Sequence, residues 1–265
     1  MRKPRHTTRL AAAALSLLAL FSVDAAFAAS AEAFLSGAST ECVGCDLTGA
    51  DFSNKSMKGV NLSGADLTDV SFFQTNLTEA NLAGAKLDLA NFTQANLKNA
   101  NLSGTSLVQT TFYRASMEQA DLTKAIGSEV VFTRAVMRHA RFDGADLYYS
   151  NFTQATLGGA SFVETLLSGS ILKDVTLHGI DFSGAFLEGV DLKNANMRAS
   201  KLVGAIVAGS DLYGVDFKDA DLTNADFTGS RLVAAGINSA KHDGAIFTDA
   251  IMPNGKVFAG DVEAK

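Results

Sequence analysis

Proline is scarce in this sequence: the 265 residues contain 2 prolines, where average usage would give about a dozen. There are also 2 cysteines and no tryptophan. Low proline with 23 glycines excludes a collagen-like chain and most disordered classes, and two cysteines are too few for a disulfide-built scaffold. A hydrophobic core must therefore hold the fold, and residues other than proline must make the turns.

Long apolar runs are also lacking. The longest, residues 10–23, is shorter than the roughly 20 residues that a membrane-spanning helix needs. It follows the basic stretch 1–10 and precedes Ala26–Ala28, an A-x-A site. This order is typical of a secretory signal peptide. We therefore predict a signal peptide over 1–28, cleavage between Ala28 and Ala29, and export to the periplasm or the extracellular medium; a retained membrane anchor is the alternative.

Basic side chains are fewer than acidic ones. Removal of residues 1–28 takes four of the 22 basic and one of the 28 acidic side chains, which leaves a net charge of −9. An acidic chain of this kind is a poor candidate for binding nucleic acid.

A five-residue period runs through most of the chain. From Leu47 to Met252 every fifth residue is large and apolar, apart from Gly127 and His242. The residue two before each of these centres is small, apart from Lys55. Because a period of five matches neither a helix nor a strand, the chain must turn in every repeat and place one large and one small side chain inward.

Four repeats close one coil, as a longer period shows. Glycines and phenylalanines both recur at an interval of twenty residues. The phenylalanines in this phase are Phe52, Phe72, Phe92, Phe112, Phe132 and Phe152, followed in a second phase by Phe142, Phe162 and Phe182. The spacing predicts a solenoid of about 10 coils of four pentapeptides, with equivalent side chains stacked about 4.8 Å apart.

Several repeats resemble a known motif. Ala65–Asp69, Ala80–Gly84 and Ala220–Asn224 are similar to the A(D/N)LxX motif of the pentapeptide repeat family. The resemblance extends from residue 45 to about 257. It implies an all-β fold, a right-handed quadrilateral β-helix. Some members of that family resemble duplex DNA in shape and charge and bind type II topoisomerases.

The ends of the repeat predict the domain limits: an N-terminal cap over 29–44, the β-helix over 45–257, and a C-terminal tail over 258–265. The cap carries Cys42 and Cys45 in a CxxC sequence. In an exported protein we favour a disulfide between them over redox activity, because no βαβ pattern surrounds the pair, and over metal binding, because further ligands are missing.

Three residues depart from the inward pattern. At Gly127 either a cavity or bend results, or Ile126 turns inward to fill the gap, which is the repair that we favour. We expect Lys55 to extend its ammonium group to solvent. We expect His242 to be a partly exposed residue of the closing coil.

The sequence contains little that could perform catalysis. His139 and His178 are predicted to lie two coils apart, about 10 Å by the strand spacing, which is too far to share a metal ion. We find no Ser-His-Asp arrangement, phosphate-binding glycine loop or HExxH segment. The repeat itself accounts for the many aspartates. We therefore expect no catalytic residues, no metal site and no cofactor.

The outward positions contain two stripes at steps of twenty. One is apolar and is interrupted by Asp226; it contains Leu166, Phe186, Ile206 and Ile246. Such a stripe is a candidate protein interface, although coverage by C-terminal segments or simple tolerance would also explain it. The other is basic but broken, which is typical of a solvated face; it contains Lys58, Lys98, Arg138, His178, Arg198 and Lys218.

These observations favour a non-enzymatic, exported structural or protein-binding module that contacts an unknown protein or a second copy through an outer face. The alternative, which the family resemblance suggests, is a DNA-mimicking modulator of a type II topoisomerase. The signal peptide argues against that alternative.

Overall fold

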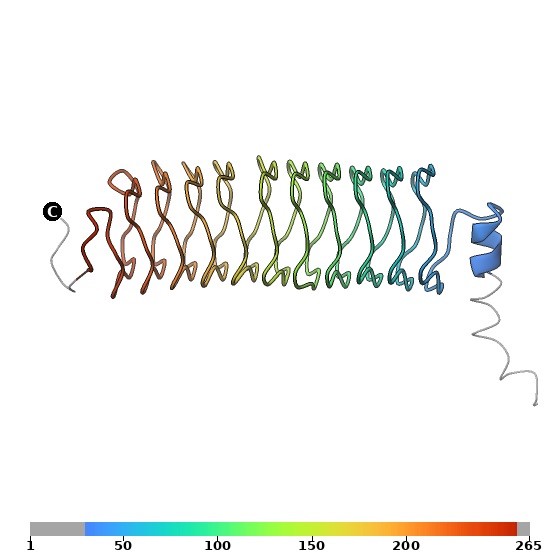
Figure 1. Cartoon of the computed structure of the whole chain (residues 1–265), viewed down its shortest axis with the longest axis horizontal. Helices are drawn as coiled ribbons and strands as arrows, with labels where there is room; N and C mark the ends of the chain where they lie inside the picture. Colours follow the sequence, from blue (N-terminus) through green and yellow to red (C-terminus); the bar gives the residue numbers. More distant parts are fainter. Residues whose placement is uncertain (1–29, 259–265) are drawn as a thin grey trace, which may run out of the picture.

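The computed structural model describes residues 30–258, which form a rod of stacked coils (Figure 1). A short helix, residues 30–35, lies at the N-terminal end of the rod. The coils contain no extended strands in the described part of the chain. Instead, single residues form parallel bridges with the residue twenty positions on, from the pair Glu41 and Asn61 to the pair Arg231 and Ile251. The ladder therefore starts one repeat before the boundary expected at residue 45.

Each pentapeptide ends in a β-turn. In the repeat of Leu47, the N–H of Ala50 donates to the carbonyl of Leu47 over 3.0 Å, and the turn residue Gly49 has a φ of 68°. A positive φ at the third turn position is the mark of a type II turn, which favours glycine there. The equivalent residues have positive φ from Gly44 through Asp249, apart from Ser239.

The backbone N–H groups explain the scarcity of proline. In the repeat of Leu67, the N–H of Asp66 donates to the coil before it, and those of Leu67 and Asp69 donate to the coil after it. The N–H of Val70 closes the turn, and the N–H of Thr68 donates to the Asp66 carboxylate. Because proline lacks this donor, it would break a bond at every position. Pro253 takes the position of Thr68, the only one whose N–H bonds to a side chain rather than to the backbone.

The core is a continuous column of inward side chains. Centres and small residues are both buried along nearly the whole ladder. Rings from Phe72 to Phe152 stack with centroids 4.8 to 5.2 Å apart. Buried hydroxyls at small positions bond to backbone carbonyls, as Thr75 Oγ1 does to Phe52 at 2.7 Å. Ser150 Oγ is the one buried side-chain oxygen among the described residues that has no partner, so the column satisfies nearly all of its polar groups internally.

Gly127 is accommodated differently from the expected repair. Ile126 does not turn inward, since 60% of its surface is exposed. A methyl group on Gly127 would lie 2.8 Å from Leu107 Cβ and 2.9 Å from Val130 Cγ2. The space left by the missing side chain is therefore filled by Val130, a larger residue at the small position, and by close approach of Leu107. Ile126 keeps its outward place because its N–H donates to Thr105 and its carbonyl accepts from Leu107, both in the coil before it.

The ladder of the described residues is interrupted at one place, on the side of the rod that contains Val136. On this side the bridges run in sequence up to the pair Val136 and Thr156 and resume with the pair Thr176 and Asn196, but Thr156 and Thr176 form no bridge. The N–H groups of residues 157 and 159 have no backbone acceptor there either. The two coils are thus joined through their other three sides.

The ends of the rod are closed by different means. At the N-terminal end, Phe34 of the short helix packs edge to face on Phe52, with ring centroids 5.8 Å apart. At the other end, Ile251 and Val257 form an antiparallel bridge, and the N–H of Phe258 donates to Ala250. Both segments lie at the ends of the rod, where open backbone edges invite end-to-end association of solenoids.

Candidate functional site

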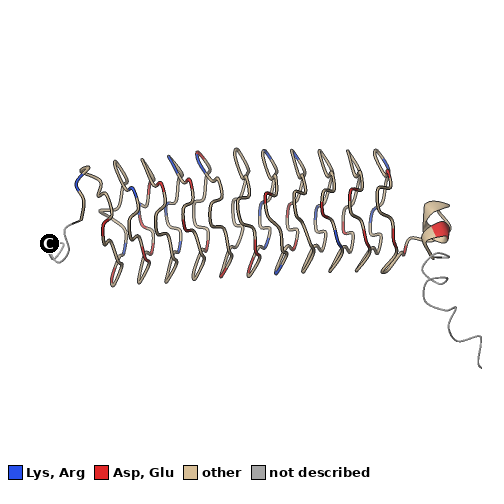
Figure 2. Ribbon diagram, turned by 60° about the horizontal axis from the view of Figure 1, so that its bottom comes forward, with Lys and Arg blue, Asp and Glu red and all other residues tan. Residues whose placement is uncertain are grey.

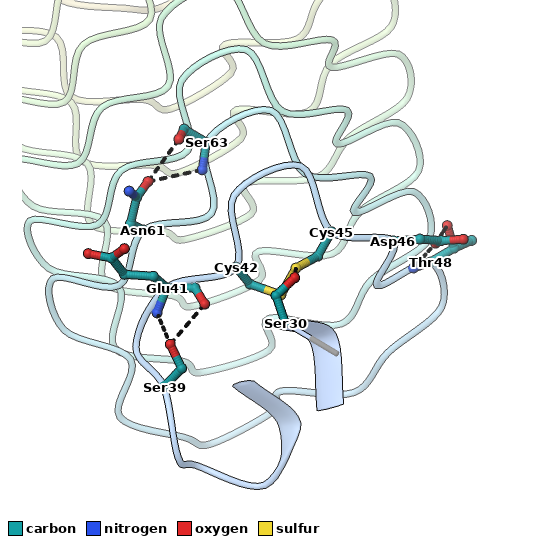
Figure 3. The surroundings of a disulfide bond; sticks show 9 residues. All are labelled: Ser30, Ser39, Glu41, Cys42, Cys45, Asp46, Thr48, Asn61 and Ser63. Carbon is teal, nitrogen blue, oxygen red and sulfur yellow. Dashed lines mark hydrogen bonds between the residues drawn. A yellow bond between two sulfur atoms is a disulfide. The ribbon is translucent and has the colours of Figure 1, made fainter. Parts of the chain in front are cut away.

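The first coil carries the cysteine pair. Cys42 and Cys45 form a disulfide with their Cα atoms 5.4 Å apart (Figure 3). Cys42 takes a centre position and Cys45 a small position, and both are fully buried. The Ser30 hydroxyl lies 3.3 Å from Cys45 Sγ. The disulfide therefore belongs to the core of the first coil, and burial separates its sulfur atoms from solvent. Ala28 and Ala29, the predicted cleavage site, lie outside the described residues.

A cleft of about 350 Å³ lies between the short helix and the first coil. Its lining includes Phe34, Phe52 and Lys55. Lys55 is exposed, and its Nζ lies 5.3 Å from the centroid of the Phe52 ring. The long side chain at this small position thus places its ammonium over the face of the Phe52 ring and keeps its charge in water.

The apolar stripe forms one column of the rod, which we call the Phe186 column. Its members bridge in succession: Ile126, Asp146, Leu166, Phe186, Ile206, Asp226 and Ile246. Phe186 is 39% and Ile246 47% exposed, whereas Leu166 and Ile206 are half-buried. The structure therefore places Leu166, Phe186 and Ile206 side by side and separates Ile246 from them by Asp226. The sequence argument considered Ile126 as a repair at Gly127, and the ladder makes it a member of this column.

Many of the turns at both edges of the Phe186 column contain glycine over this stretch. The turns that follow it contain Gly169, Gly189 and Gly209, and those that precede it contain Gly184 and Gly204. A methyl group on Gly189, Gly204 or Gly209 would meet no atom within 4 Å. The face is therefore open beside Phe186 and Ile206, whereas the Tyr149 ring lies over Gly169 next to Leu166. The exposed Glu164 and Glu188 also flank the column.

The basic stripe is largely neutralised by its neighbours. Lys98 and Arg138 both pair with Glu118, at 3.8 and 3.2 Å. Lys58 and Arg198 also pair with carboxylates, at 3.4 and 3.6 Å. Acidic and basic residues are interspersed along the rod (Figure 2). These contacts agree with a solvated face rather than a nucleic-acid groove.

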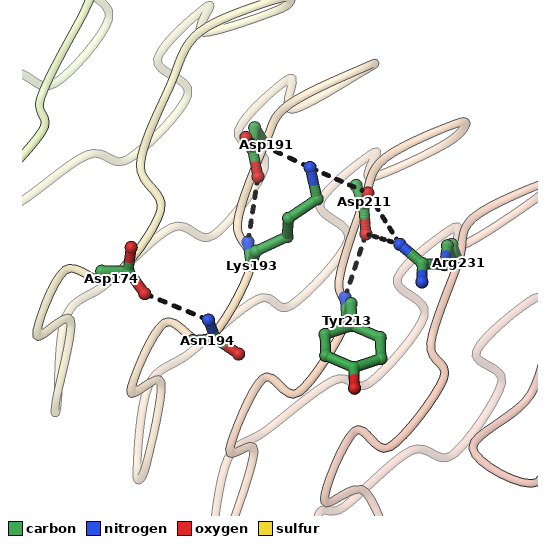
Figure 4. Close-up of polar contacts among 7 residues, drawn as sticks. All are labelled: Asp174, Asp191, Lys193, Asn194, Asp211, Tyr213 and Arg231. Carbon is green, nitrogen blue, oxygen red and sulfur yellow. Dashed lines mark hydrogen bonds and ion pairs between the residues drawn. The ribbon is translucent and has the colours of Figure 1, made fainter.

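Aspartates before the centres repeat a local geometry. The carboxylate of Asp66 accepts the side-chain hydroxyl of Thr68 at 2.7 Å, and this bond lowers the pKa of Asp66. Lys86, one coil on, pairs with the same carboxylate at 3.1 Å. In the C-terminal half Lys193 lies between Asp191 and Asp211, at 3.5 and 3.2 Å (Figure 4). Asp residues of this kind stabilise turns and neighbouring coils, so their number is no sign of catalysis.

Asp146 differs from these aspartates. It lies between Ile126 and Leu166 in the ladder, and burial raises its pKa. Neither Asp146 nor Asp226 forms an ion pair with any residue between 30 and 258. The sequence argument treated Asp226 as an interruption and did not single out Asp146. Both aspartates lie at steps of twenty residues from Phe186, and this spacing is the sequence signal that could have identified them.

The described residues contain no group of three or more His, Cys, Asp or Glu side chains placed to hold a metal ion. No helix within residues 30–258 has the length and apolar character required to cross a membrane. The exposed His242 shares a hydrogen bond of 3.0 Å with the carbonyl of Ala240 and lies near Phe247 in the closing coils.

The ladder, the turns and the inward side chains define a β-solenoid built from short repeats. Family models described as "Pentapeptide repeat region" and "Pentapeptide repeats (8 copies)" match residues 43–122 and, in four segments, residues 110–229 with a one-residue gap. The chain belongs to the pentapeptide repeat family, and the prediction made from its motifs is confirmed. Proteins of this family form right-handed β-helices.

Solved structures similar to this chain are also pentapeptide repeat proteins. HetL, a protein involved in heterocyst differentiation regulation from the cyanobacterium Nostoc sp. strain PCC 7120, is 23% identical, with 86% of this chain and 97% of HetL covered and a TM-score of 0.40. QnrB1, a plasmid-mediated fluoroquinolone resistance protein, is 25% identical, with 62% and 84% covered and a TM-score of 0.34. No curated protein matches the chain.

Proposed function

We propose that this protein is a non-enzymatic, exported rod of about ten four-repeat coils that binds another protein through the Phe186 column. The observation that carries the proposal is the juxtaposition of Leu166, Phe186 and Ile206, with open space at glycine turns beside Phe186 and Ile206. Exposed apolar side chains that are contiguous are a feature of interaction surfaces, and the centre of such a surface supplies most of the binding energy.

The test replaces Phe186 and Ile206 by Asp in the full chain. Both point outward, so the fold is expected to survive, and circular dichroism and the thermal midpoint check this. The matched control is Leu89→Asp, because Leu89 is 51% exposed on the N-terminal half of the rod. We expect cross-linking in the native compartment to lose its partner in the double variant and to keep it in the control. Unchanged cross-linking and sedimentation would refute the proposed face.

Export is tested separately. Fractionation followed by N-terminal sequencing is expected to find a chain that starts at Ala29, and an intact Met1 in the exported fraction would contradict cleavage. Thiol labelling of the native exported protein is expected to find no free sulfhydryl at Cys42 or Cys45. Labelling at both residues under denaturing conditions without reductant would disprove the disulfide in the exported protein.

A second candidate function, modulation of a type II topoisomerase by DNA mimicry, comes from the family resemblance. The observation that favours it is a set of acidic side chains around the Phe186 column that form no ion pair within residues 30–258: Asp146, Glu164, Glu188 and Asp226. A DNA gyrase supercoiling assay with the purified mature protein decides this case. We expect no change in supercoiling, because the centre of this face is apolar rather than charged.

A further inference from the structure

The face around the Phe186 column also indicates the kind of partner, and this inference depends on the proposed function. We propose that its occupant is an amphipathic helix that lies along the rod axis, with apolar side chains at its centre and a Lys or Arg towards each end. The face, from residue 144 to 229, consists of the column itself and the turn residues on either side of it.

Charge is the first argument. On this face the structure places four acidic side chains and no Lys or Arg: Asp146, Glu164, Glu188 and Asp226. Asp146 and Asp226 are the two neighbours of the apolar triplet in the ladder. The column therefore presents a carboxylate, three apolar side chains and a second carboxylate, in that order. A complementary ligand is apolar at its centre and cationic on both sides.

The second argument is the contrast with other aspartates that precede a centre. Several of them pair with a cation one coil on, as Asp66 does with Lys86 and Asp181 with Lys201. Asp146 is instead followed by an apolar residue in the ladder, and so is Asp226. Among residues 30–258 no cation pairs with either carboxylate. A basic ligand would supply the missing charges.

Spacing favours a helix over a strand. Successive members of the column are one coil, about 4.8 Å, apart. Side chains on one face of a helix are about 5 to 6 Å apart, whereas those on one face of a strand are about 6.6 Å apart. The open space at Gly189, Gly204 and Gly209 leaves room beside Phe186 and Ile206 for a helix, a cylinder of about 10 Å diameter. Asp146 and Asp226 are four coils, about 19 Å, apart, which corresponds to about 13 residues of helix.

A second copy of the chain fits less well. If two rods met through this column in parallel, each Asp146 would face its own equivalent. If they met antiparallel about Phe186, Asp146 would face Asp226. Both arrangements bring unpaired carboxylates together next to an apolar contact, and like charges there oppose association.

The probes are two synthetic helical peptides of about 19 residues with leucines at helical spacing. One carries two Lys about 14 positions apart, which is about four helical turns and places both on the leucine face, and the other has Gln in their place. Binding to the mature protein is measured by fluorescence anisotropy against wild type, Phe186→Asp, and the double variant Asp146→Asn with Asp226→Asn. The control variant is Asp66→Asn, an acid three coils before Ile126 on the same side of the rod. Sedimentation of each protein alone reports self-association.

We expect the Lys peptide to lose about fivefold in affinity with the double Asn variant, as two exposed ion pairs would give, and to lose none with Asp66→Asn. The affinity of the Gln peptide is expected to be the same for wild type and double variant. Phe186→Asp is expected to abolish binding of both peptides, and added salt to weaken the Lys peptide only.

The failures are distinguishable. If both peptides bind equally and only Phe186→Asp abolishes their binding, the inference of a basic partner is wrong. The proposed face would then remain the binding site. Binding that survives Phe186→Asp would refute the face itself. No binding of either peptide at about 1 mM, a concentration that detects interactions of only about 4 kcal/mol, would overturn the helical partner. A wild-type dimer that Phe186→Asp dissociates would also overturn it, in favour of a second copy.

Discussion

The ring of Phe142 meets that of Phe132 edge to face, with centroids 5.8 Å apart and planes at 87°. Phe132 belongs to the stack that starts at Phe52, and Phe142 stacks on Phe162 at 4.6 Å in the second phase of the twenty-residue period. Phe142 also meets Phe152 edge to face at 6.1 Å. The two aromatic stacks therefore overlap and contact each other across the core in the middle of the rod.

We predict that Phe142→Leu destabilises the protein more than Phe72→Leu does. Both rings are fully buried. Phe142 has three aromatic neighbours, one stacked and two edge to face, whereas Phe72 has two, both stacked. Each such pair contributes about 0.5 to 1.5 kcal/mol beyond burial. Urea unfolding, followed by circular dichroism, should place the difference at about 0.5 to 1.5 kcal/mol, the contribution of one additional pair. Equal midpoints would show that the crossing of the stacks adds no stability.

Substitutions at two turn positions with positive φ are expected to change the free energy of unfolding in opposite directions. Leu89 is exposed and has a φ of 63°, a conformation that costs a non-glycine residue about 1 kcal/mol or more. Leu89→Gly is therefore expected to raise the free energy of unfolding by about 1 kcal/mol. Gly104→Ala, at a φ of 65° with open space around it, is expected to lower it by a similar amount. Thermal midpoints that move in the same direction for both variants would contradict this account.

The packing around Gly127 predicts that a second substitution, at Val130, recovers stability lost by a substitution of Gly127. Gly127→Ala places a methyl group against Leu107 and Val130 and is expected to cost about 1 to 3 kcal/mol through overpacking. Val130→Ala in the same chain makes room, so the double variant is expected to be more stable than the sum of the two single changes predicts. Additive midpoints of chemical unfolding would show that Val130 does not fill the space at Gly127.

The interruption between the coils of residues 156 and 176 predicts fast hydrogen exchange in the interior of the rod. The amides of Leu157 and Gly159 donate to no backbone carbonyl in the described structure, whereas that of Met137, one coil earlier, donates to Thr156 at 2.7 Å. We expect exchange at Leu157 and Gly159 to be faster than at Met137 and at Leu177, which has a backbone acceptor in the next coil. Equal protection, measured by NMR, would show that the ladder is continuous there.

Two aspartates predict opposite dependences on pH. The bond from Thr68 lowers the pKa of Asp66, so its stabilising contribution is present above the unfolded pKa, near 3.8, and is lost as pH falls through the folded pKa. Thr68→Val is thus expected to reduce stability at neutral pH and to have little effect at pH values about 2 units lower than the unfolded pKa.

Burial raises the pKa of Asp146, so its ionised form destabilises the folded chain above that pKa. Asp146→Asn is therefore expected to increase stability at neutral pH, and the gain is expected to disappear below about pH 4. Unfolding midpoints at several pH values test both variants. A gain for Asp146→Asn that persists in strong acid would point to a cause other than the charge.

The five-residue period by itself determined the repeat, the inward and outward positions and the family, because every repeat must satisfy the same burial and turn requirements. It also accounted for the scarcity of proline, since nearly every N–H is used. Packing between coils decided what a single repeat cannot specify. Ile126 stays outward because Val130 and Leu107 close the space at Gly127.

The interaction face also depends on packing between coils that a single repeat does not specify. The sequence picked out Leu166, Phe186 and Ile206 at steps of twenty. The absence of ion-pair partners for Asp146 and Asp226 within the described chain depends instead on which side chains reach across from adjacent coils and turns. The missing bridge between residues 156 and 176 likewise has no counterpart in the repeat pattern, because hydrogen bonding between coils depends on how closely backbone positions twenty residues apart approach each other.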